Sequence, residues 1–254
     1  MSPLASEVVD EAVDLARRAG DLTLRWFRSH DLDVARKGDG TVVTVADREA
    51  ERLVRDELRS AHPDDAIVGE EHGLDSGDSG RTWFVDPIDG TTGFVRGVPL
   101  YSTLLALCDE EGPCLGVIHL PAVQSTVWAV RGGGCFVDGR PCQVSGTDDL
   151  ADALVTTSAY ETFRAEQMSR LLATGAALRT WGDGFGYYLV ATGRAEVMVD
   201  PVAREWDLAA MPVILAEAGG RFSALDGTGA FDAGNGLATN GRLHDEVLAL
   251  LDVL

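Results

Sequence analysis

One segment restricts the fold of this chain more than any other, because an apolar run ends there in two carboxylates three residues apart. The segment reads Val85-Asp86-Pro87-Ile88-Asp89-Gly90-Thr91-Thr92. Two acids this close repel each other unless a positive charge lies between them. A hard divalent cation such as Mg²⁺ suits that position, since it takes oxygen ligands and keeps waters for a phosphate. The alternative is an ordinary turn after a strand, in which Asp and Gly serve only as capping residues.

The residues after the second acid are suited to binding an anion. Gly90 permits close approach of the backbone to a ligand. Thr91 and Thr92 are placed to begin a helix, whose first N–H groups have no partner within the helix and attract negative charge.

Further acids stand at the ends of other expected elements. Glu70 and Glu71 follow the apolar run 66–68, and Asp207 precedes an apolar helix expected over 208–218. Taken singly, the acid pair is compatible with an exposed loop and Asp207 with a helix N-cap. Three such positions in one chain favour a shared metal site.

A fourth segment runs from Lys37 to Asp47. Its simplest interpretation is a hairpin followed by a helix capped at Asp47. Lys37 is the only lysine among the 21 basic residues. We expect it to be a point charge near the acidic site; the alternative is an exposed surface lysine.

Hydrophobic periodicity predicts two kinds of structure along the chain. Helices are expected over 4–29, after Ser2 as a cap and Pro3 at the first helical position, and over 47–61. Short strands are expected over 66–68 and 82–85, with a loop over 75–80 between them. Four more, over 102–108, 114–119, 126–130 and 135–137, have short connections rich in Gly, Pro and Asp, which indicate an antiparallel meander. Beyond residue 150, strands alternate with helices expected over 162–174, 185–192, 208–218 and 243–251.

This pattern predicts a layered sandwich of mixed α+β and α/β type. We expect an N-terminal half, 1–147, with the antiparallel sheet and most of the metal ligands. We expect a C-terminal half, 148–254, with a mixed sheet, the substrate-specificity segment and Asp207. The two halves are expected to share one core.

Composition excludes several classes of function. The 254-residue chain is 45% hydrophobic with a net charge of −20, which disfavours a nucleic-acid partner because phosphate backbones require a basic face. It has no run of 18 apolar residues, so no membrane span is expected. The N-terminal residues lack the pattern of a signal peptide, so we expect a cytoplasmic protein whose four cysteines are buried free thiols.

Together and in this order, the four segments resemble the inositol monophosphatase superfamily. The matching motifs are a lysine-containing segment that runs into V-T-x-x-D at 43–47, G-E-E at 69–71, D-P-I-D-G-T at 86–91 and W-D at 206–207. The resemblance covers nearly the whole chain and implies an αβαβα fold. It also implies Mg²⁺-dependent hydrolysis of a small phosphomonoester, with two to three ions per active site, by a homodimer.

The resemblance implies metal-binding roles for five residues. Glu70, Asp86 and the carbonyl of Ile88 would hold one ion. Asp86, Asp89 and Asp207 would hold a second, and Glu70 would help to hold a weaker third. The side chain of Ile88 is expected to be core packing only.

The resemblance also implies the catalytic groups. Asp47 and Thr91 would orient the attacking water, with Glu70 beside it, and the backbone N–H groups of Gly90 and Thr91 would cradle the phosphate. The reaction requires such a set, because phosphomonoesters hydrolyse very slowly without a catalyst and a side-chain base alone supplies only about 10²–10⁴-fold.

The substrate is indicated by the stretch 179–188. Its Gly182-Asp183 pair, followed by aromatic residues, resembles the histidinol-phosphatase branch of the family. L-Histidinol phosphate carries an ammonium group and a titratable imidazole, which Asp183 and Asp200 would pair with. Alternatively, Asp200 only ends a strand and Arg179 is a surface residue. The expected substrate contacts are Lys37, Asp89, Gly90, Thr91, Arg179, Asp183, Asp200 and Asp207.

Other functions stay open on sequence alone. An inositol-1-phosphate or broad sugar-phosphate phosphatase would carry the same general motifs. A nucleotide-bisphosphate phosphatase is less favoured, since no purine-reading segment is evident. A metal-binding domain without catalysis is a different class, against which the intact acidic set argues.

Overall fold

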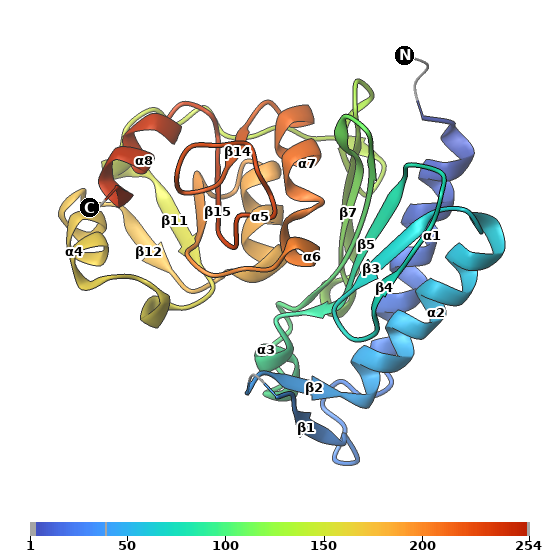
Figure 1. Cartoon of the computed structure of the whole chain (residues 1–254). Helices are drawn as coiled ribbons and strands as arrows, with labels where there is room; N and C mark the ends of the chain where they lie inside the picture. Colours follow the sequence, from blue (N-terminus) through green and yellow to red (C-terminus); the bar gives the residue numbers. More distant parts are fainter. Residues whose placement is uncertain (1–3, 39, 253–254) are drawn as a thin grey trace.

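The structure, a computed structural model, describes residues 4–38 and 40–252 and has five layers (Figure 1). Across these residues the order is a helix pair, an eight-stranded sheet, a middle layer of helices, a five-stranded sheet and an outer helix pair. This arrangement confirms the layered sandwich predicted from the sequence.

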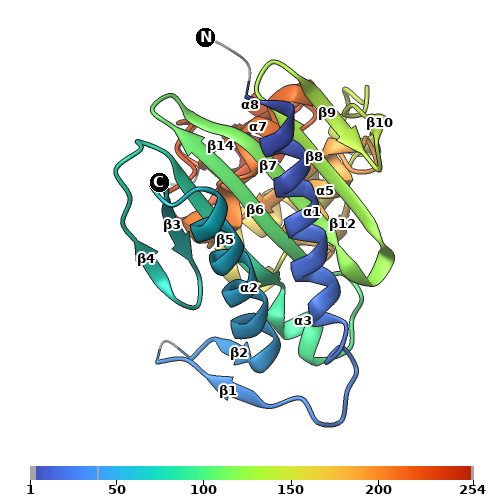
Figure 2. The same ribbon diagram turned by 90° about the vertical axis from the view of Figure 1, so that its right-hand side faces the viewer.

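The first layer contains α1 (Ser6–Thr23) and α2 (Val45–Ala61), which cover the outer face of the large sheet (Figure 2). Their apolar faces pack on sheet residues such as Trp83, Leu105 and Val117. At the start of α2, Ala46 N–H donates to the Thr44 hydroxyl and Thr44 N–H donates to Asp47. This capping box fixes Asp47 in the first turn of the helix.

The large sheet has the strand order β10-β9-β8-β7-β6-β5-β3-β4. From β5 to β10, each strand pairs antiparallel with its sequence neighbour, as in the predicted meander. β3 instead pairs parallel to β5. The strands are β3 (Ala66–Gly69), β4 (Gly73–Asp75), β5 (Thr82–Asp89), β6 (Ser102–Asp109), β7 (Gly112–Leu120), β8 (Ser125–Val130), β9 (Gly134–Val137) and β10 (Arg140–Pro141).

The second sheet has the order β12-β11-β13-β15-β14 and contains parallel and antiparallel pairs, as predicted. Its strands are β11 (Leu154–Thr157), β12 (Ala177–Arg179), β13 (Val197–Asp200), β14 (Arg221–Ser223) and β15 (Gly236–Thr239). The helices around it are α4 (Ala165–Ala173), α5 (Asp183–Ala191), α6 (Glu205–Leu208), α7 (Met211–Glu217) and α8 (His244–Leu251). Of these, α5, α6 and α7 lie between the two sheets, and α4 and α8 cover the outer face (Figure 1).

The middle layer packs against both sheets. One buried cluster contains Ile118 from β7, Met198 from β13 and Met211 from α7. A Cβ added at Gly116 would lie 2.6 Å from the carbonyl oxygen of Ala210, so a glycine is needed for this close approach. The division of the chain at residue 147 stays a prediction.

Several short elements lie between the main helices and strands. The predicted hairpin is present as β1 (Val34–Arg36) and β2 (Val42–Thr44), and α3 (Thr91–Val95) follows β5. Three single-turn 3₁₀ helices cover Pro121–Val123, Leu150–Asp152 and Tyr160–Thr162.

Several boundaries differ from the prediction. The first helix ends at Thr23, followed by hydrogen-bonded turns, and the predicted cap at Ser2 and Pro3 lies outside the described residues. The helix predicted over 208–218 is two helices, because Pro212 has no N–H to donate and so begins a new one, α7. The short edge strand β4, which ends at Asp75, is not among the strands predicted from the sequence.

Two simpler expectations also have outcomes. The four cysteines are free thiols, of which Cys142 is only partly buried. None of the helices in the described ranges is both long and apolar enough to span a bilayer.

Candidate active site

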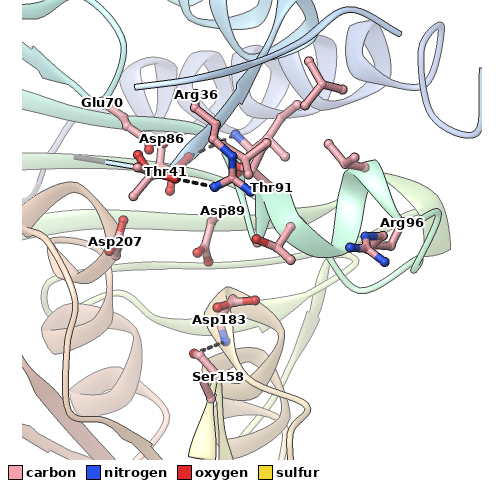
Figure 3. Close-up of a pocket in the computed structure, with 18 of the residues that line it drawn as sticks. Arg36, Thr41, Glu70, Asp86, Asp89, Thr91, Arg96, Ser158, Asp183 and Asp207 are labelled. Carbon is pink, nitrogen blue, oxygen red and sulfur yellow. Dashed lines mark hydrogen bonds between the residues drawn. The ribbon is translucent and has the colours of Figure 1, made fainter. Parts of the chain in front are cut away.

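The parallel pairing of β3 with β5 brings two of the predicted acids together. Gly69 lies opposite Val85 in this register, so the next residue on each strand, Glu70 and Asp86, is an acid at the same edge of the sheet. The pairing of β5 with β6 is irregular between Asp86 and Asp89. Both strand-end acids of β5 and Glu70 line one pocket (Figure 3).

This pocket has a volume of about 660 Å³ and is lined by residues of both halves of the chain. Carboxylate oxygens of Asp86, Asp89 and Asp207 lie within 4.8 Å of one another. Asp207 comes from α6, where its Oδ2 accepts the Arg204 N–H at 2.7 Å. Asp207 is therefore both a residue of a capping box and a member of the acidic cluster.

Burial makes this cluster electrostatically unfavourable without a counter-charge. Burial raises the pKa of Asp86, and Glu70 and Asp89 raise it further. Burial and the neighbouring Asp183 raise the pKa of Asp89 in the same way. Burial also raises the pKa of Asp207 to about 7. A cation held between these groups would remove the repulsion.

The donor set fits a hard divalent cation. The three clustered side chains offer only carboxylate oxygens, which Mg²⁺ prefers. The Ile88 carbonyl lies at the same strand end and accepts a hydrogen bond from the Thr91 hydroxyl at 3.0 Å. The Ile88 side chain is fully buried against Phe94 and Tyr101, as expected for core packing.

Asp47 lies behind Thr91 and contacts it directly. The Thr91 hydroxyl is 3.4 Å from Asp47 Oδ1. The other oxygen, Oδ2, accepts bonds from the Thr44 hydroxyl at 2.6 Å and the Thr44 N–H at 2.8 Å. Burial raises the pKa of Asp47 to about 6, although the Thr44 bonds oppose this rise. Asp47 thus caps α2 and also faces a residue of the pocket.

Lys37 is paired and only partly exposed. Its Nζ lies 2.7 Å from Glu70 Oε1 and 2.6 Å from Glu71 Oε1, and 22% of its side chain is exposed. Burial raises the pKa of Glu71 to about 7 even beside this lysine. The interpretation of Lys37 as a free surface lysine is therefore wrong.

The turn at Gly90 lines the pocket. Gly90 has φ of 88°, a left-handed conformation that favours glycine, and an added Cβ would lie 2.8 Å from Asp183 Oδ2. Asp89 Oδ2 accepts the Ser102 hydroxyl at 3.0 Å and also the Gly184 N–H. The start of α5 is thereby tied to the strand end of β5.

Asp183 and Asp200 are linked through one serine. The Ser158 hydroxyl donates to Asp200 at 2.5 Å and accepts the Asp183 N–H at 2.8 Å. Asp183 and Ser158 line the pocket (Figure 3). Asp200 is 5% exposed and lies behind Ser158. Burial raises the pKa of both acids, that of Asp200 to about 7.

Arg179 lies apart from this pocket. It ends β12, is exposed, and its guanidinium lies 5.8 Å from the centre of the Trp181 ring. It is not among the pocket's described lining residues, and its contact with substrate stays a prediction. Sequence reasoning instead missed two arginines that do line the pocket, Arg36 and Arg96 (Figure 3). Their only sequence signal is proximity to Lys37 and to the strand-end acids.

Comparison with known proteins places the chain among phosphatases. The sequence model of the inositol monophosphatase family matches residues 4–253. The chain is 42% identical to the histidinol-phosphatase of Mycobacterium tuberculosis, over 95% of this chain and 96% of that one. It is 41% identical to the histidinol-phosphatase of Chlorobaculum parvum, over 90% and 93% of the two chains.

Solved structures agree with the sequence match. The inositol monophosphatase of Thermotoga maritima superposes with a TM-score of 0.87 at 32% identity, covering 97% of each chain. The suhB protein of Bartonella henselae superposes with a TM-score of 0.91 at 29% identity, covering 97% of this chain and 98% of that one. The chain belongs to the inositol monophosphatase family.

Proposed function

We propose that this phosphoric monoester hydrolase depends on Mg²⁺ and converts L-histidinol phosphate to L-histidinol and phosphate. The observation that carries the metal dependence is the group of Asp86, Asp89 and Asp207, whose oxygens lie within 4.8 Å of one another. Three acids at this spacing, of which Asp86 and Asp89 are buried and Asp207 is partly buried, are unfavourable alone and favourable around a divalent cation.

The proposed metal ligands are those implied by the family resemblance. Glu70, Asp86 and the Ile88 carbonyl would hold one ion, and Asp86, Asp89 and Asp207 a second, with Glu70 contributing to a weaker third. When bound, Mg²⁺ would lower the pKa of a water and screen the negative phosphate.

The chain's own groups would position the reactants and move a proton. Thr91 orients the attacking water, and Asp47 receives its proton through the Thr91 hydroxyl, 3.4 Å away. An Asp47 whose pKa is raised to about 6 is a better base near neutral pH than an ordinary aspartate. The N–H groups of Gly90 and Thr91, at the start of α3, hold the phosphate oxygens.

The substrate proposal rests on the acids at the start of α5 and the end of β13, and on relatives. Asp183 lines the pocket beside Asp89, and it would pair with the ammonium or imidazole of L-histidinol phosphate. Asp200, linked to it through Ser158, would add negative charge behind it. Three relatives named histidinol-phosphatase are 39–42% identical to this chain.

A comparison of kcat/KM for histidinol phosphate and inositol-1-phosphate, with and without Mg²⁺, tests this proposal. We expect histidinol phosphate to be favoured at least about tenfold, and activity to require Mg²⁺. An Asp183→Asn variant keeps the backbone bond to Ser158 and loses the charge. It should lower kcat/KM for histidinol phosphate more than for inositol-1-phosphate, which serves as the internal control.

Inositol-1-phosphate is the second candidate substrate. Its support is the fructose-1,6-bisphosphatase/inositol-1-monophosphatase of Thermotoga maritima, 34% identical over 96% of this chain. A preference of about tenfold or more for inositol-1-phosphate would overturn the histidinol phosphate proposal. No turnover across a wide panel of phosphomonoesters would favour a metal-binding domain without catalysis.

We further propose that the protein is a homodimer, as the family resemblance implies, and that it is cytoplasmic. Light scattering coupled to size-exclusion chromatography would measure the mass in solution. A monomer mass at micromolar concentration would contradict the dimer.

A further inference from the structure

A buried ion pair lies behind the turn that carries Glu70, and the reaction described above does not use it. Glu51 is fully buried and Arg55 is 2% exposed, both on α2. Arg55 Nε donates to Glu51 Oε1 at 2.7 Å. Because removing two charges from water costs several kcal/mol per ion, such a pair is weak evidence for a stabilising role alone.

The Glu51 carboxylate accepts the backbone of that turn. The N–H of Glu71 donates to Oε2 at 2.7 Å, and the N–H of His72 donates to Oε1 at 3.1 Å. The His72 ring Nδ1 lies 3.4 Å from the same Oε1. Glu51 therefore holds the two residues that directly follow Glu70.

Strand β3 leaves room for the Glu51 carboxylate at Gly69. A Cβ added at Gly69, the residue before Glu70, would lie 2.1 Å from Glu51 Oε1. The glycine is therefore required where β3 passes the acid. Glu51 therefore contacts the chain on both sides of Glu70: it lies close to Gly69 before it and accepts hydrogen bonds from Glu71 and His72 after it.

Arg55 contacts the residues that follow the turn, in β4. Its Nη2 donates to the Gly73 carbonyl, and its Nη1 lies 2.9 Å from Asp75 Oδ2. The guanidinium thus binds the first and last residues of β4 while it neutralises Glu51. Together the two side chains contact the backbone or side chains of residues 71, 72, 73 and 75.

Asp47, Glu51 and Arg55 are spaced four residues apart and therefore lie along one face of α2. Asp47 faces Thr91, and Glu51 holds the Glu70 turn. One rigid helix thus sets the position of the proposed base relative to a proposed metal ligand.

We infer that Glu51, kept in place by Arg55, is a positioning residue that fixes Glu70 for metal binding and catalysis. This inference rests on the proposed function. Residues that orient metal ligands typically contribute about 10–100-fold to metal affinity or activity. The effect of Glu51 should therefore be visible in Mg²⁺ binding as well as in turnover.

The test compares Glu51→Gln with Glu49→Gln, a matched change on the same helix outside this network. Calorimetric titration should show Mg²⁺ affinity about 10–100-fold weaker in Glu51→Gln and unchanged in Glu49→Gln. The variant should also lose kcat with a smaller change in KM. A folded Glu51→Gln protein with wild-type Mg²⁺ affinity would overturn the inference, even if its melting temperature fell.

A second variant covers the case in which Glu51→Gln does not fold. Glu51→Asp keeps the negative charge opposite Arg55 but is one methylene too short to hold both N–H groups. It should weaken Mg²⁺ binding in the same direction, and wild-type affinity would again overturn the inference. In the wild-type protein, the amides of Glu71 and His72 should be protected from hydrogen exchange. Exchange at the rate of an open loop would refute the hydrogen bonds between these amides and Glu51.

The wild-type control separates this inference from the proposed function. If the wild-type protein binds Mg²⁺ but hydrolyses no phosphomonoester, the proposed function fails. The affinity comparison between the Glu51 and Glu49 variants still decides the positioning role.

Discussion

Replacing Asp89 by Asn should make the metal-free protein more stable while removing its activity. Both hydrogen bonds to the Asp89 side chain, from Ser102 and Gly184, go to the same oxygen, Oδ2. An asparagine keeps them by placing its carbonyl oxygen there. The substitution therefore removes an ionisable carboxyl group from the cluster and leaves the packing intact.

The size of the effect follows from the spacing of the cluster. Two unit charges 4.8 Å apart repel by about 3 kcal/mol at an effective dielectric constant of about 20. Asp89 has two such neighbours, Asp86 and Asp207. The raised pKa values of all three acids let the metal-free protein neutralise part of this charge. We therefore expect a gain of about 2 kcal/mol near neutral pH, or about 4–8 °C in melting temperature for a chain of this size.

Scanning calorimetry in EDTA and in Mg²⁺ measures both sides of the argument. In EDTA, Asp89→Asn should melt above the wild type. With Mg²⁺ the order should reverse, because the wild type gains about 3 kcal/mol at about 100 times its dissociation constant and the variant gains little. Asp10→Asn removes an exposed charge from α1 and should change neither value.

Two results would refute this reasoning. A lower melting temperature for Asp89→Asn in EDTA would show that mutual repulsion does not dominate the cluster. Near-normal turnover in the variant would show that Asp89 is not a required metal ligand.

Three further predictions concern pH, the proposed water site and the contact between α5 and β6. Burial raises the pKa of Asp200 and Asp207 from 3.8 to about 7, so between pH 3.8 and pH 7 the folded metal-free protein binds more protons than the unfolded chain. Its melting temperature in EDTA should therefore fall as the pH rises through this window, and Mg²⁺ should make the fall smaller. A melting temperature that rises with pH in EDTA would contradict this prediction. Thr91→Val should lower kcat by about 10²–10⁴-fold at an unchanged melting temperature, because it removes the hydroxyl facing Asp47; steady-state assays at saturating substrate measure this, and unchanged kcat would exclude the role. Gly184→Ala should lower the unfolding free energy by about 1–3 kcal/mol in urea titrations, since its Cβ would lie 2.2 Å from the hydroxyl oxygen of Ser102; wild-type stability would show that the contact relaxes freely.

Local sequence patterns were sufficient to predict much of this site. Asp86 and Asp89 follow a buried strand in a segment whose proline and glycine leave few alternatives, and the structure places both at one strand end. Asp207 was predicted as a cap or a ligand, and its position allows both. The capping box at Asp47 is equally local, because it requires only residues 44–47.

Long-range contacts were not predictable in the same way. Glu70 lies near Asp86 because β3 pairs parallel to β5. The order of strands in a sheet cannot be predicted from local hydrophobic periodicity. Glu51 and Arg55, spaced four residues apart on a helix, look in the sequence like an ordinary solvated ion pair. Only the packing of α2 on the sheet buries them. Arg179 was singled out for its neighbours in sequence, but β12 places it away from the pocket.

The four-residue spacing of Asp47, Glu51 and Arg55 has a consequence for how this chain can change. Each residue added to or removed from a helix turns everything beyond it by about 100° and shifts it by about 1.5 Å. A single-residue insertion between 47 and 51 would swing the second acid off the sheet-facing side and release the Glu70 turn. Substitutions elsewhere on the helix surface leave this geometry untouched. The number of residues in α2 from 47 to 55 therefore fixes the relative positions of these three side chains. Natural variants should differ there by replacement and never by insertion or deletion.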